Sequence, residues 1–450
     1  MYRILANCVV GLGFSKRGFA AGLRRRPDLI GCDAGSSDFG PAFLGRGSDS
    51  KSELAVSRDL DIMVRGAREI GVPLVFGSVG GPGAAPHVDR FRDQLAGISQ
   101  RAGIKLRVAL IYADQSKTGV ADAVRASRLR GLGPVPDLTV DDVMSSERIV
   151  AMMGAGPYQE ALAAGADVIV AGRSTDPAIF AGGPLSRGLP LGPAWHAAKC
   201  VDKGYLATTR PADGSPVLAT IDDEGFTIEP TREGSRCTVR SVSSLTMHEN
   251  PDPYSVAQPS GVIDTSECKY EAVGETAVRV TGSQFRVTPP SVKLEGSRRI
   301  GHRAVAILGM RDPRLLRRLD EFLDEFRSRL GRGLDSIGLP ASEYTLRFRT
   351  YGRDGVLGDV EPARPSSPHE VGLVIDVVAK SAADAKTVVS RAVPIGSRLD
   401  LLGVLGGGGN FAAPFSPNVL DGGEVYEWSV WHLMDVADEN DPFSIEYVEV

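Results

Sequence analysis

Three apolar runs in the first half of the chain each end in a loop of glycine, hydroxyl and acidic residues. They read DLIGCDAGSSD (28–38), PLVFGSVGGPG (73–83) and ADVIVAGRSTD (166–176). A short apolar run bounded by glycine and followed by a helical pattern predicts a buried parallel strand, and open α/β sheets bind ligands outside the carboxyl ends of such strands. If the three strands share one sheet, their loops line one pocket. The loop residues brought together would be Asp33, Ser36, Ser37, Asp38, Gly77, Ser78, Gly80, Gly81, Arg173, Ser174, Thr175 and Asp176.

The order of strand and helix patterns predicts three parts in a chain of 450 residues, because hydrophobic cores stop growing at roughly 250 to 300 residues. Residues 1–203 alternate short apolar runs, among them IVAMMG at 149–154, with amphipathic helices, which predicts an α/β ligand-binding domain with a mostly parallel, doubly wound sheet. Residues 204–298 lose the helical periodicity and are expected to form a β-rich insert or linker domain. Residues 299–450 show the order β-α-β-β-α-β of a ferredoxin-like α+β domain, with a glycine-rich stretch at 403–418 as a flap or a plain loop.

Composition favours a small-molecule partner. The net charge is −5 and no long basic block occurs, which argues against nucleic acid and against an acidic membrane surface. Five scattered cysteines without a CxxC motif are typical of reduced thiols and indicate the cytoplasm. The N-terminus lacks the pattern of a signal peptide, and no apolar run approaches the 18 residues of a membrane span.

The acidic loop residues raise the question of their counter-charge. Two carboxylates about 4 Å apart repel by roughly 4 kcal/mol at an effective dielectric constant near 20, so Asp33, Asp38 and Asp176 could converge only with a cation or a shared proton between them. Arg173 is one candidate, and Mg²⁺ held by Asp33, Asp38 and Asp176 is the other, because hard cations prefer oxygen ligands. The alternative is that these aspartates cap helices.

The glycine-rich loop at 77–83 is the candidate anion site. Backbone amides freed by glycine can surround a carboxylate, a phosphate or a developing oxyanion, although a tight turn explains the same residues. The loop is neither a Walker A motif nor a GxGxxG motif, so neither nucleotide hydrolysis nor an NAD cofactor is expected.

Two further pairs of residues could carry proton transfer. His196 and Lys199 in PAWHAAKC share one face of a predicted helix, and histidine is the usual proton shuttle near neutral pH, but an ordinary packed histidine fits the same pattern. Lys293 and Glu295 would lie on the same side of a strand, either as a solvated ion pair or as a cation and a base facing the pocket. His248 and His432 are weaker candidates. The spacing of histidines and cysteines predicts no zinc site, and neither a GxSxG elbow nor an activated cysteine is recognisable.

Several long strings of the sequence, taken together, resemble the acyclic terpene utilisation (AtuA-like) family. They are GCDAGSSDFGPAFLG, GSVGGPG, MMGAGPYQEALAAGADVIVAGRSTDPAIFA, GPAWHAAK, VKLEGSRRIGHRAVAILGMRDP and VYEWSVWH, and they span nearly the whole chain. The resemblance implies a role in the catabolism of acyclic terpenes, with a branched acyl-CoA as the type of substrate. Carried over residue by residue, it favours as pocket members Asp33, Ser37, Asp38, Arg173, Asp176, His196, Lys199, Lys293 and Glu295. Loops of the family often read GSCGTSG where this chain has GSVGGPG, so a thiol and a hydroxyl are missing here.

The leading hypothesis is an enzyme that acts on a carboxylate or acyl-CoA substrate by lyase or hydratase chemistry. In it the amides of residues 77–81 and Arg173 would hold the developing negative charge, and His196 or an aspartate would move the proton. One alternative is a Mg²⁺-dependent hydrolase. Another is a non-catalytic metabolite-binding subunit of a larger complex. A homo-oligomer is expected by analogy with ferredoxin-like domains, and a small partner subunit is a further option.

Overall fold

The computed structural model describes residues 1–211, 214–363, 368–401, 403 and 409–450. It divides into two compact units. The first, unit 1, comprises Met1–Arg298 and Trp428–Val450, and the second, unit 2, comprises Arg299–Glu427. Each unit is described by itself.

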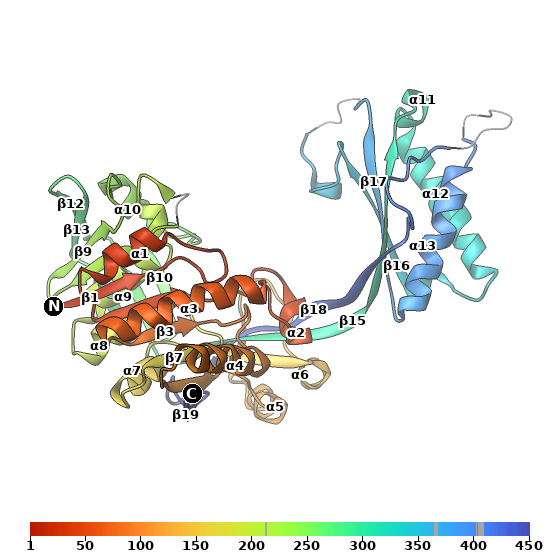
Figure 1. Cartoon of the computed structure of the whole chain (residues 1–450). Coiled ribbons are helices and arrows are strands. Elements are labelled where there is room, and N and C mark those ends of the chain that lie inside the picture. Colours follow the sequence, from red (N-terminus) through yellow and green to blue (C-terminus); the bar gives the residue numbers. More distant parts are fainter. Residues whose placement is uncertain (212–213, 364–367, 402, 404–408) are drawn as a thin grey trace. The chain divides into compact units, whose positions relative to one another are not determined.

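A ten-stranded mixed sheet forms the centre of unit 1 (Figure 1). Five neighbouring strands at its middle are parallel, in the order β1 (Tyr2–Ala6), β2 (Leu29–Asp33), β3 (Leu74–Gly77), β7 (Val168–Ala171) and β4 (Arg107–Tyr112). Antiparallel strands extend it on both sides: β8 (Val217–Ile221), β9 (Gly225–Pro230), β13 (Ala277–Thr281) and β12 (Lys269–Val273) beyond β1, and β19 (Ser444–Glu449) beyond β4.

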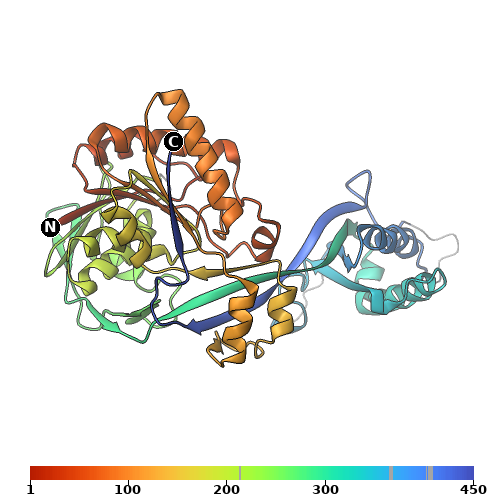
Figure 2. The same cartoon turned by 90° about the horizontal axis from the view of Figure 1, so that it is seen from below.

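The middle strands are short and apolar because helices cover both of their faces. Every residue of β2, β3 and β7 is buried, which is typical of parallel strands between two helix layers. One face packs on α1 (Lys16–Leu23), α3 (Glu53–Ile70) and α4 (Ala85–Ala102), and the other packs on α7 (Gly156–Ala163), α8 (Asp176–Ser186) and α9 (Leu191–Asp202) (Figure 2). The fit on the second face is close: a Cβ on Gly31 of β2 would lie 2.6 Å from the ring of Phe180 in α8.

The β-rich stretch at 204–298 is built into unit 1. It supplies four strands of the large sheet, β8, β9, β12 and β13, and a three-stranded antiparallel sheet of β10 (Ser255–Gln258), β11 (Gly261–Asp264) and β14 (Gln284–Val287). Further elements of unit 1 are α2 (Pro41–Arg46), α5 (Lys117–Arg125), β5 (Leu129–Gly131), α6 (Val140–Ser145), η1 (Gly204–Ala207) and α10 (Val239–Leu245).

One strand expected in the parallel sheet lies in another sheet. The IVAMMG run forms β6 (Arg148–Met152), which pairs antiparallel with the first half of β15 (Ser291–Met310). Apolar character predicts that a segment is a buried strand, but the pairing partner of β6 lies far away in the sequence. This pairing matters for function because β15 carries Lys293 and Glu295.

Unit 2 has the element order expected from the sequence. Strands β16 (Tyr344–Tyr351), β17 (Val371–Ala379), β15 and β18 (Leu420–Asp435) are neighbours in that order. The described part of the unit also contains the helices α11 (Pro313–Leu316), α12 (Leu319–Asp335) and α13 (Ala382–Ser397) and the short 3-10 helices η3 (Ala341–Glu343) and η4 (Gly358–Val360). Phe322, Phe326 and Leu330 are spaced by four residues and form one buried face of α12. Whether the unit is ferredoxin-like, and whether the sheet of unit 1 is doubly wound in the strict sense, stay predictions. Of the flap expected at 403–418, residues 404–408 lie outside the described residues.

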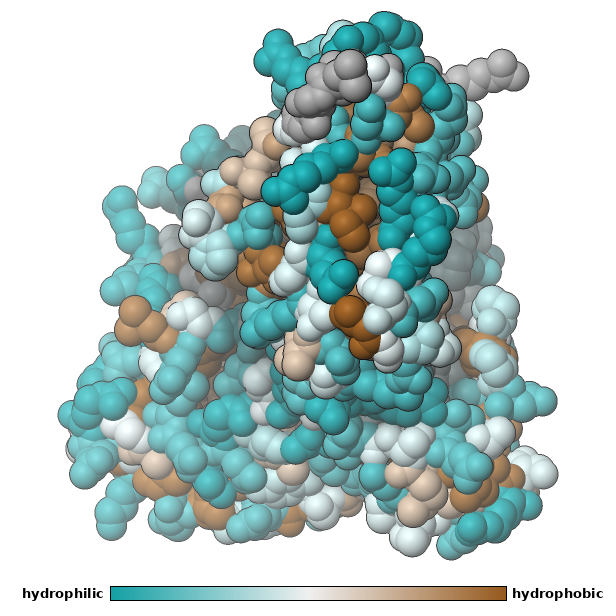
Figure 3. Space-filling view, turned by 90° about the vertical axis from the view of Figure 1, so that its right-hand side faces the viewer, coloured by the Kyte–Doolittle hydropathy of each residue, from teal (hydrophilic) through white to brown (hydrophobic). Residues whose placement is uncertain are grey.

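The surface seen in Figure 3 is mostly hydrophilic, and its apolar residues stand in small groups. Within the described ranges, no helix combines the length and the hydropathy needed to cross a bilayer. All five cysteines are free thiols, four of them buried.

Candidate functional site

The loops that follow β2, β3 and β7 meet at one edge of the sheet, as predicted. β3 lies between the other two strands and is parallel to both. Backbone hydrogen bonds join the loops directly: Ala34 N donates to Gly77 O at 3.0 Å, Ser78 N to Gly172 O at 2.9 Å, and Arg173 N to Gly83 O at 3.0 Å. The three loops therefore form one continuous layer at the carboxyl edge.

Glycine permits this close contact between the loops. A Cβ on Gly35 would lie 2.3 Å from Gly81 Cα, and a Cβ on Gly83, whose φ is +66°, would lie 2.3 Å from Arg173 N. Real Cβ atoms do not approach backbone so closely, and residues other than glycine disfavour positive φ. These glycines are needed for packing between loops.

A buried ion cluster, which we call the cationic cluster, joins this edge to β15. Arg173 donates from Nε to Glu295 Oε2 at 3.0 Å and from Nη2 to Glu295 Oε1 at 3.1 Å, while Lys293 Nζ lies 2.7 Å from Glu295 Oε1. The Arg173 and Glu295 side chains are 6% and 0% exposed. Burial by itself would raise the pKa of Glu295, but the two cations hold it at about 2. With two cations for one carboxylate, the cluster has a surplus positive charge.

Lys293 is held by an aromatic ring as well as by its ion pair. Its ammonium lies 3.5 Å from the centroid of the Trp431 ring, in β18, a cation–π contact. Burial lowers the pKa of Lys293, and Glu295 opposes this shift. Val292 and Leu294, the neighbours of Lys293 in β15, point into a hydrophobic core. Because side chains alternate along a strand, Lys293 and Glu295 both lie on the opposite side of β15 from this core, as predicted.

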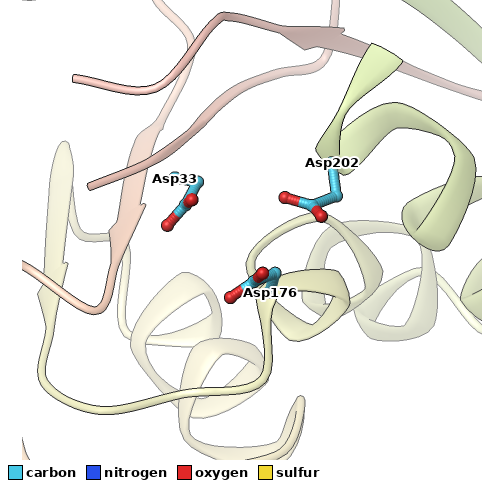
Figure 4. A group of neighbouring side chains, drawn as sticks. All are labelled: Asp33, Asp176 and Asp202. Atoms are coloured by element: carbon cyan, nitrogen blue, oxygen red, sulfur yellow. The ribbon is translucent and has the colours of Figure 1, made fainter. Parts of the chain in front are cut away.

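A second cluster, the aspartate cluster, consists of Lys203 and three aspartates, Asp33, Asp176 and Asp202, which Figure 4 shows. Lys203 Nζ lies 3.3 Å from Asp33 Oδ2, 3.4 Å from Asp176 Oδ2 and 3.1 Å from Asp202 Oδ1. Asp33 ends β2, Asp176 begins α8 and Asp202 ends α9. The counter-charge that the acidic loops require is therefore this lysine, while Arg173 pairs with Glu295.

Burial and mutual repulsion leave one aspartate of this cluster protonated at neutral pH. Burial, and after it the charge on Asp176, raise the pKa of Asp202 to about 8 against the opposing effect of Lys203. The pKa of Asp33 is also raised, mainly by burial and then by Asp176. Burial disfavours the ammonium of Lys203, but the three carboxyl groups outweigh it and raise the pKa of the lysine. The cluster thus holds a cation, Lys203, and a carboxylic acid that can donate a proton, Asp202, beside two further carboxyl groups.

Hydroxyl groups surround the cationic cluster. Ser37 Oγ donates to Glu295 Oε1 at 3.2 Å, and Arg173 Nη1 donates to Ser78 Oγ at 3.3 Å. The Tyr158 hydroxyl donates to Ser174 Oγ at 2.9 Å, on the loop segment between Arg173 and Asp176. The charge of Asp176 also raises the pKa of Arg173, so the aspartate cluster and the cationic cluster lie near each other.

The remaining loop residues have structural partners or lie at the surface. Asp38 is exposed, and its charge acts on Arg173 and Lys293. Ser36 Oγ accepts from Asp38 N at 3.1 Å, and Thr175 Oγ1 donates to Gln258 Oε1 at 3.0 Å.

The glycine-rich loop uses its amides within the fold. Ser78 N donates to Gly172 O, Val79 N to Ala171 O and Gly81 N to Ser78 O. Gly77 is packed against Ser174 Oγ and Tyr158 Oη, each 2.6 Å from the position of a Cβ. This geometry favours the tight-turn interpretation of residues 77–83 over that of an anion cradle.

The histidine candidates lie apart from both clusters. His196 is completely buried, with Nδ1 2.7 Å from Ser283 Oγ and Nε2 3.3 Å from Thr246 Oγ1, and burial lowers its pKa to about 4. His248 pairs with its neighbour Glu249 at 3.4 Å, and His432 Nε2 lies 3.2 Å from Pro136 O.

The role expected of His196 and Lys199 on α9 stays a prediction, and a different part of the helix contributes to the aspartate cluster. Lys199 is half-buried and makes no ion pair among the described residues, whereas Asp202 and Lys203, at the C-terminal end of α9, reach the carboxyl edge. An Asp-Lys pair at a helix end, following a buried stretch, was the available signal. Two further site residues were also missed: Tyr158, and Lys51, whose Nζ donates to Ala34 O at 3.2 Å.

Comparison of the sequence with models of known protein families identifies the family of this chain. The family model described as "Acyclic terpene utilisation family protein AtuA" matches residues 79–186 and 207–414. The matched segments include Arg173, Asp176, Lys293 and Glu295, while Lys203 lies between them. No curated protein and no solved structure matches the chain. Because the match covers most of the chain, the protein belongs to the acyclic terpene utilisation family.

Proposed function

We propose that this chain is an enzyme of acyclic terpene utilisation that adds or removes water at a carboxylate or acyl thioester by proton transfer. The observation that carries the proposal is the aspartate cluster, in which the pKa of Asp202 is raised to about 8 and two further carboxyl groups lie beside it. An acid and a base side by side are what a lyase or hydratase requires.

The two clusters have different roles in this proposal. The surplus positive charge of Arg173 and Lys293 attracts the carboxylate or the thioester carbonyl of the substrate and stabilises negative charge that develops on its oxygen. Lys203 has all three of its donors directed at carboxyl groups, so it positions the acid and the base. The carboxyl groups raise its pKa against the effect of burial, which favours the charged ammonium in this positioning role.

The proton transfers can be written for dehydration of a 3-hydroxyacyl substrate. Asp176, whose side chain is 23% exposed, takes the proton from the carbon next to the carbonyl. The bond from the neighbouring carbon to its hydroxyl breaks as Asp202 gives its proton, so the products are water and an unsaturated acyl group. A proton then returns from Asp176 to Asp202 within the cluster, which restores the starting state. Hydration runs through the same steps in reverse.

Solvent isotope exchange tests this proposal. Wild-type protein incubated in D₂O with branched 3-hydroxyacyl thioesters is expected to exchange the proton next to the carbonyl and to form the unsaturated product, both measured by mass spectrometry. Asp202→Asn keeps the shape of the side chain but cannot act as an acid, so turnover should fall by about 10²- to 10⁴-fold. Asp222→Asn, at a partly exposed ion pair with Arg279, is the control and should leave turnover unchanged. Equal turnover by Asp202→Asn and wild type would rule the proposal out.

A metal-dependent hydrolase is the second candidate, favoured by one observation. Asp33, Asp176 and Asp202 each offer an oxygen within 4.8 Å of the others, a donor set that suits Mg²⁺. This set contains Asp202 in place of the expected Asp38. The ammonium of Lys203 already contacts all three carboxyl groups, so a divalent ion would have to displace it. Loss of activity in a chelator, with recovery on addition of Mg²⁺, would favour the hydrolase; activity that persists in a chelator favours the lyase or hydratase.

A further inference from the structure

The sheet of unit 2 has two faces of different character. Alternate residues of β15 and β17 lie in a hydrophobic core together with residues of α12 and α13, and Figure 1 shows both helices on the same side of the sheet. Because side chains alternate along a strand, the residues between them point to the opposite face. We call this opposite face the arginine face; it includes Arg303 and Ile307 of β15, Val374 and Asp376 of β17, and Arg347 and Arg349 of β16.

The charge of the arginine face is unbalanced. Asp376 accepts from Arg303 Nε at 2.9 Å and from Arg349 Nη2 at 3.4 Å. Arg347 lies directly opposite Asp376 in the register of β16 and β17, but it is exposed and forms no side-chain hydrogen bond or ion pair with any residue that the structure describes. Three arginines and one aspartate leave a surplus of two positive charges. In a chain with a net charge of −5, such a surplus on one surface favours an acidic partner.

Aliphatic side chains lie beside the arginines on this face. Ile307 is exposed and is paired with Val374 across the sheet, which is paired in turn with Arg349. Val305 lies opposite Asp376. Interfaces between proteins are enriched in arginine around an apolar centre, so the composition of this face is typical of a surface that another protein covers.

The connection that follows β16 has the opposite charge. Its residues 356–361, which we call the acidic loop and which include η4, combine three aliphatic side chains with two carboxylates. Val356, Leu357 and Val360 are 80%, 50% and 75% exposed. Asp359 is exposed, Glu361 is partly exposed, and neither forms an ion pair within the described part of the chain. Exposed apolar side chains gathered in one place mark interaction sites, so the acidic loop is a second surface that lacks a partner in the single chain.

We propose that two copies of this chain form a two-fold symmetric dimer in which the acidic loop of each copy packs on the arginine face of the other. The two carboxylates of the loop match the surplus of two positive charges on the face, and the aliphatic side chains of the loop cover Ile307 and Val374. In a two-fold dimer this contact is made twice.

Two other arrangements fit the surface less well. Direct stacking of two arginine faces would set one surplus of positive charge against another, which costs free energy. The high exposure of Val356 and Val360 shows that the acidic loop does not bury them on the arginine face of its own chain. A second copy is the partner that satisfies both surfaces at once, and this dimer does not depend on the proposed chemistry.

Sedimentation equilibrium of the full-length protein tests the proposal. The wild type is expected to be a dimer whose Kd rises with salt. Arg347→Glu and Asp359→Lys should each raise the Kd at least about tenfold, because each reverses a charge in both copies of the contact. Arg317→Glu is the matched control, because it reverses the charge of an exposed arginine at the end of α11 and should leave the Kd unchanged. Circular dichroism checks that the variants are folded.

A mixture of the two charge variants distinguishes exchange between copies from packing within one chain. In a hybrid dimer of Arg347→Glu and Asp359→Lys, one contact joins the introduced glutamate to the introduced lysine, and the other joins Arg347 to Asp359. The mixture should therefore associate more tightly than either variant alone, with a Kd near that of wild type. A monomeric wild type, a dimer that neither variant weakens, or a mixture that associates no better than its components would overturn the proposal.

The aliphatic side chains of the acidic loop have a separate test. The double variant Val356→Ser and Val360→Ser removes apolar surface that is exposed in the single chain, so its Kd should rise at least about tenfold while its Tm in the monomeric state stays unchanged. Val287→Ser, at a valine of β14 that is 67% exposed, is the control and should dimerise as wild type does. Equal values of Kd for the double variant and for Val287→Ser would overturn the packing of the loop on the arginine face.

Discussion

Arg173 donates two hydrogen bonds to Glu295, 122 residues further along the chain, at 3.0 and 3.1 Å, and both side chains are almost without solvent contact. Removing one member of such a pair leaves the other charge buried and unpaired. Glu295 also neutralises Lys293, so its loss would expose two cations to each other.

Glu295→Ala is therefore expected to lower the free energy of unfolding by about 3 to 5 kcal/mol, and Glu295→Gln by less because it keeps two polar atoms. Urea denaturation measures both. The control is Asp122→Ala, which breaks an exposed pair with Arg125 whose side chains are 60–70% exposed and should change stability by less than about 1 kcal/mol. Similar losses for Glu295→Ala and Asp122→Ala would contradict the structure.

The raised pKa of Asp202 predicts a pH dependence. The folded protein keeps a proton on this residue up to about pH 8, whereas the unfolded chain loses it near pH 4. The stabilising contribution of the shift is thus fully present below pH 4 and is lost as the pH rises to about 8. Relative to wild type, Asp202→Asn should gain stability across this window, by up to about 1.4 kcal/mol per pH unit.

Denaturation of wild type and Asp202→Asn at a series of pH values measures this difference. Turnover should also fall as the pH rises through about 8, because Asp202 then loses the proton that it donates. A stability difference that stays constant between pH 4 and pH 8 would show that Asp202 has an ordinary pKa.

Gly83→Ala tests the contact between the loops. The added methyl group would lie 2.3 Å from the backbone nitrogen of Arg173. We therefore expect the free energy of unfolding to fall by at least about 3 kcal/mol, more than the positive φ alone would cost. Gly103→Ala is the matched control: its φ is +64°, close to the +66° of Gly83, but nothing lies within 4 Å of its Cβ position. Its cost should be limited to about 1 kcal/mol. Thermal unfolding of the two variants gives the comparison, and equal shifts in Tm would show that the loops are not in close contact.

His196→Gln distinguishes a structural from a catalytic histidine. The side chain is buried against Ser283 and Thr246, so its replacement should cost about 1 to 3 kcal/mol of stability. The kcat of the folded variant should stay within a few-fold of wild type. A drop of 10² or more in kcat for a variant with native circular dichroism would restore the catalytic assignment.

The parallel centre of the sheet could be predicted from the sequence because the signals of β2, β3 and β7 are local. Each is a short apolar run that ends in glycine and polar residues, and the edge that these loops share follows from the direction of the strands. Alternation along β15 likewise placed Lys293 and Glu295 on one side. In each case the decisive residues are close together in the sequence.

The remaining strand pairings and site residues could not be predicted because they depend on contacts between segments far apart in the sequence. Nothing near β6 indicates that its partner is β15, and nothing near residues 217–230 indicates that β8 extends the sheet beside β1. Lys203 was missed for a similar reason, because its role is set by where the end of α9 lies relative to Asp33 and Asp176. His196 has the residue type of a proton shuttle, but its burial among Ser283, Thr246 and Phe226 comes from segments that follow it in the chain.

The pairing of β15 with β6 sets Glu295 opposite Val150 and Lys293 opposite Met152. Because side chains alternate along a strand, a shift of this pairing by one residue would turn both charges away from Arg173 and put Val292 and Leu294 in their place. The positive charge of the cationic cluster thus depends on the register between β15 and β6 as well as on the identity of its ionisable residues.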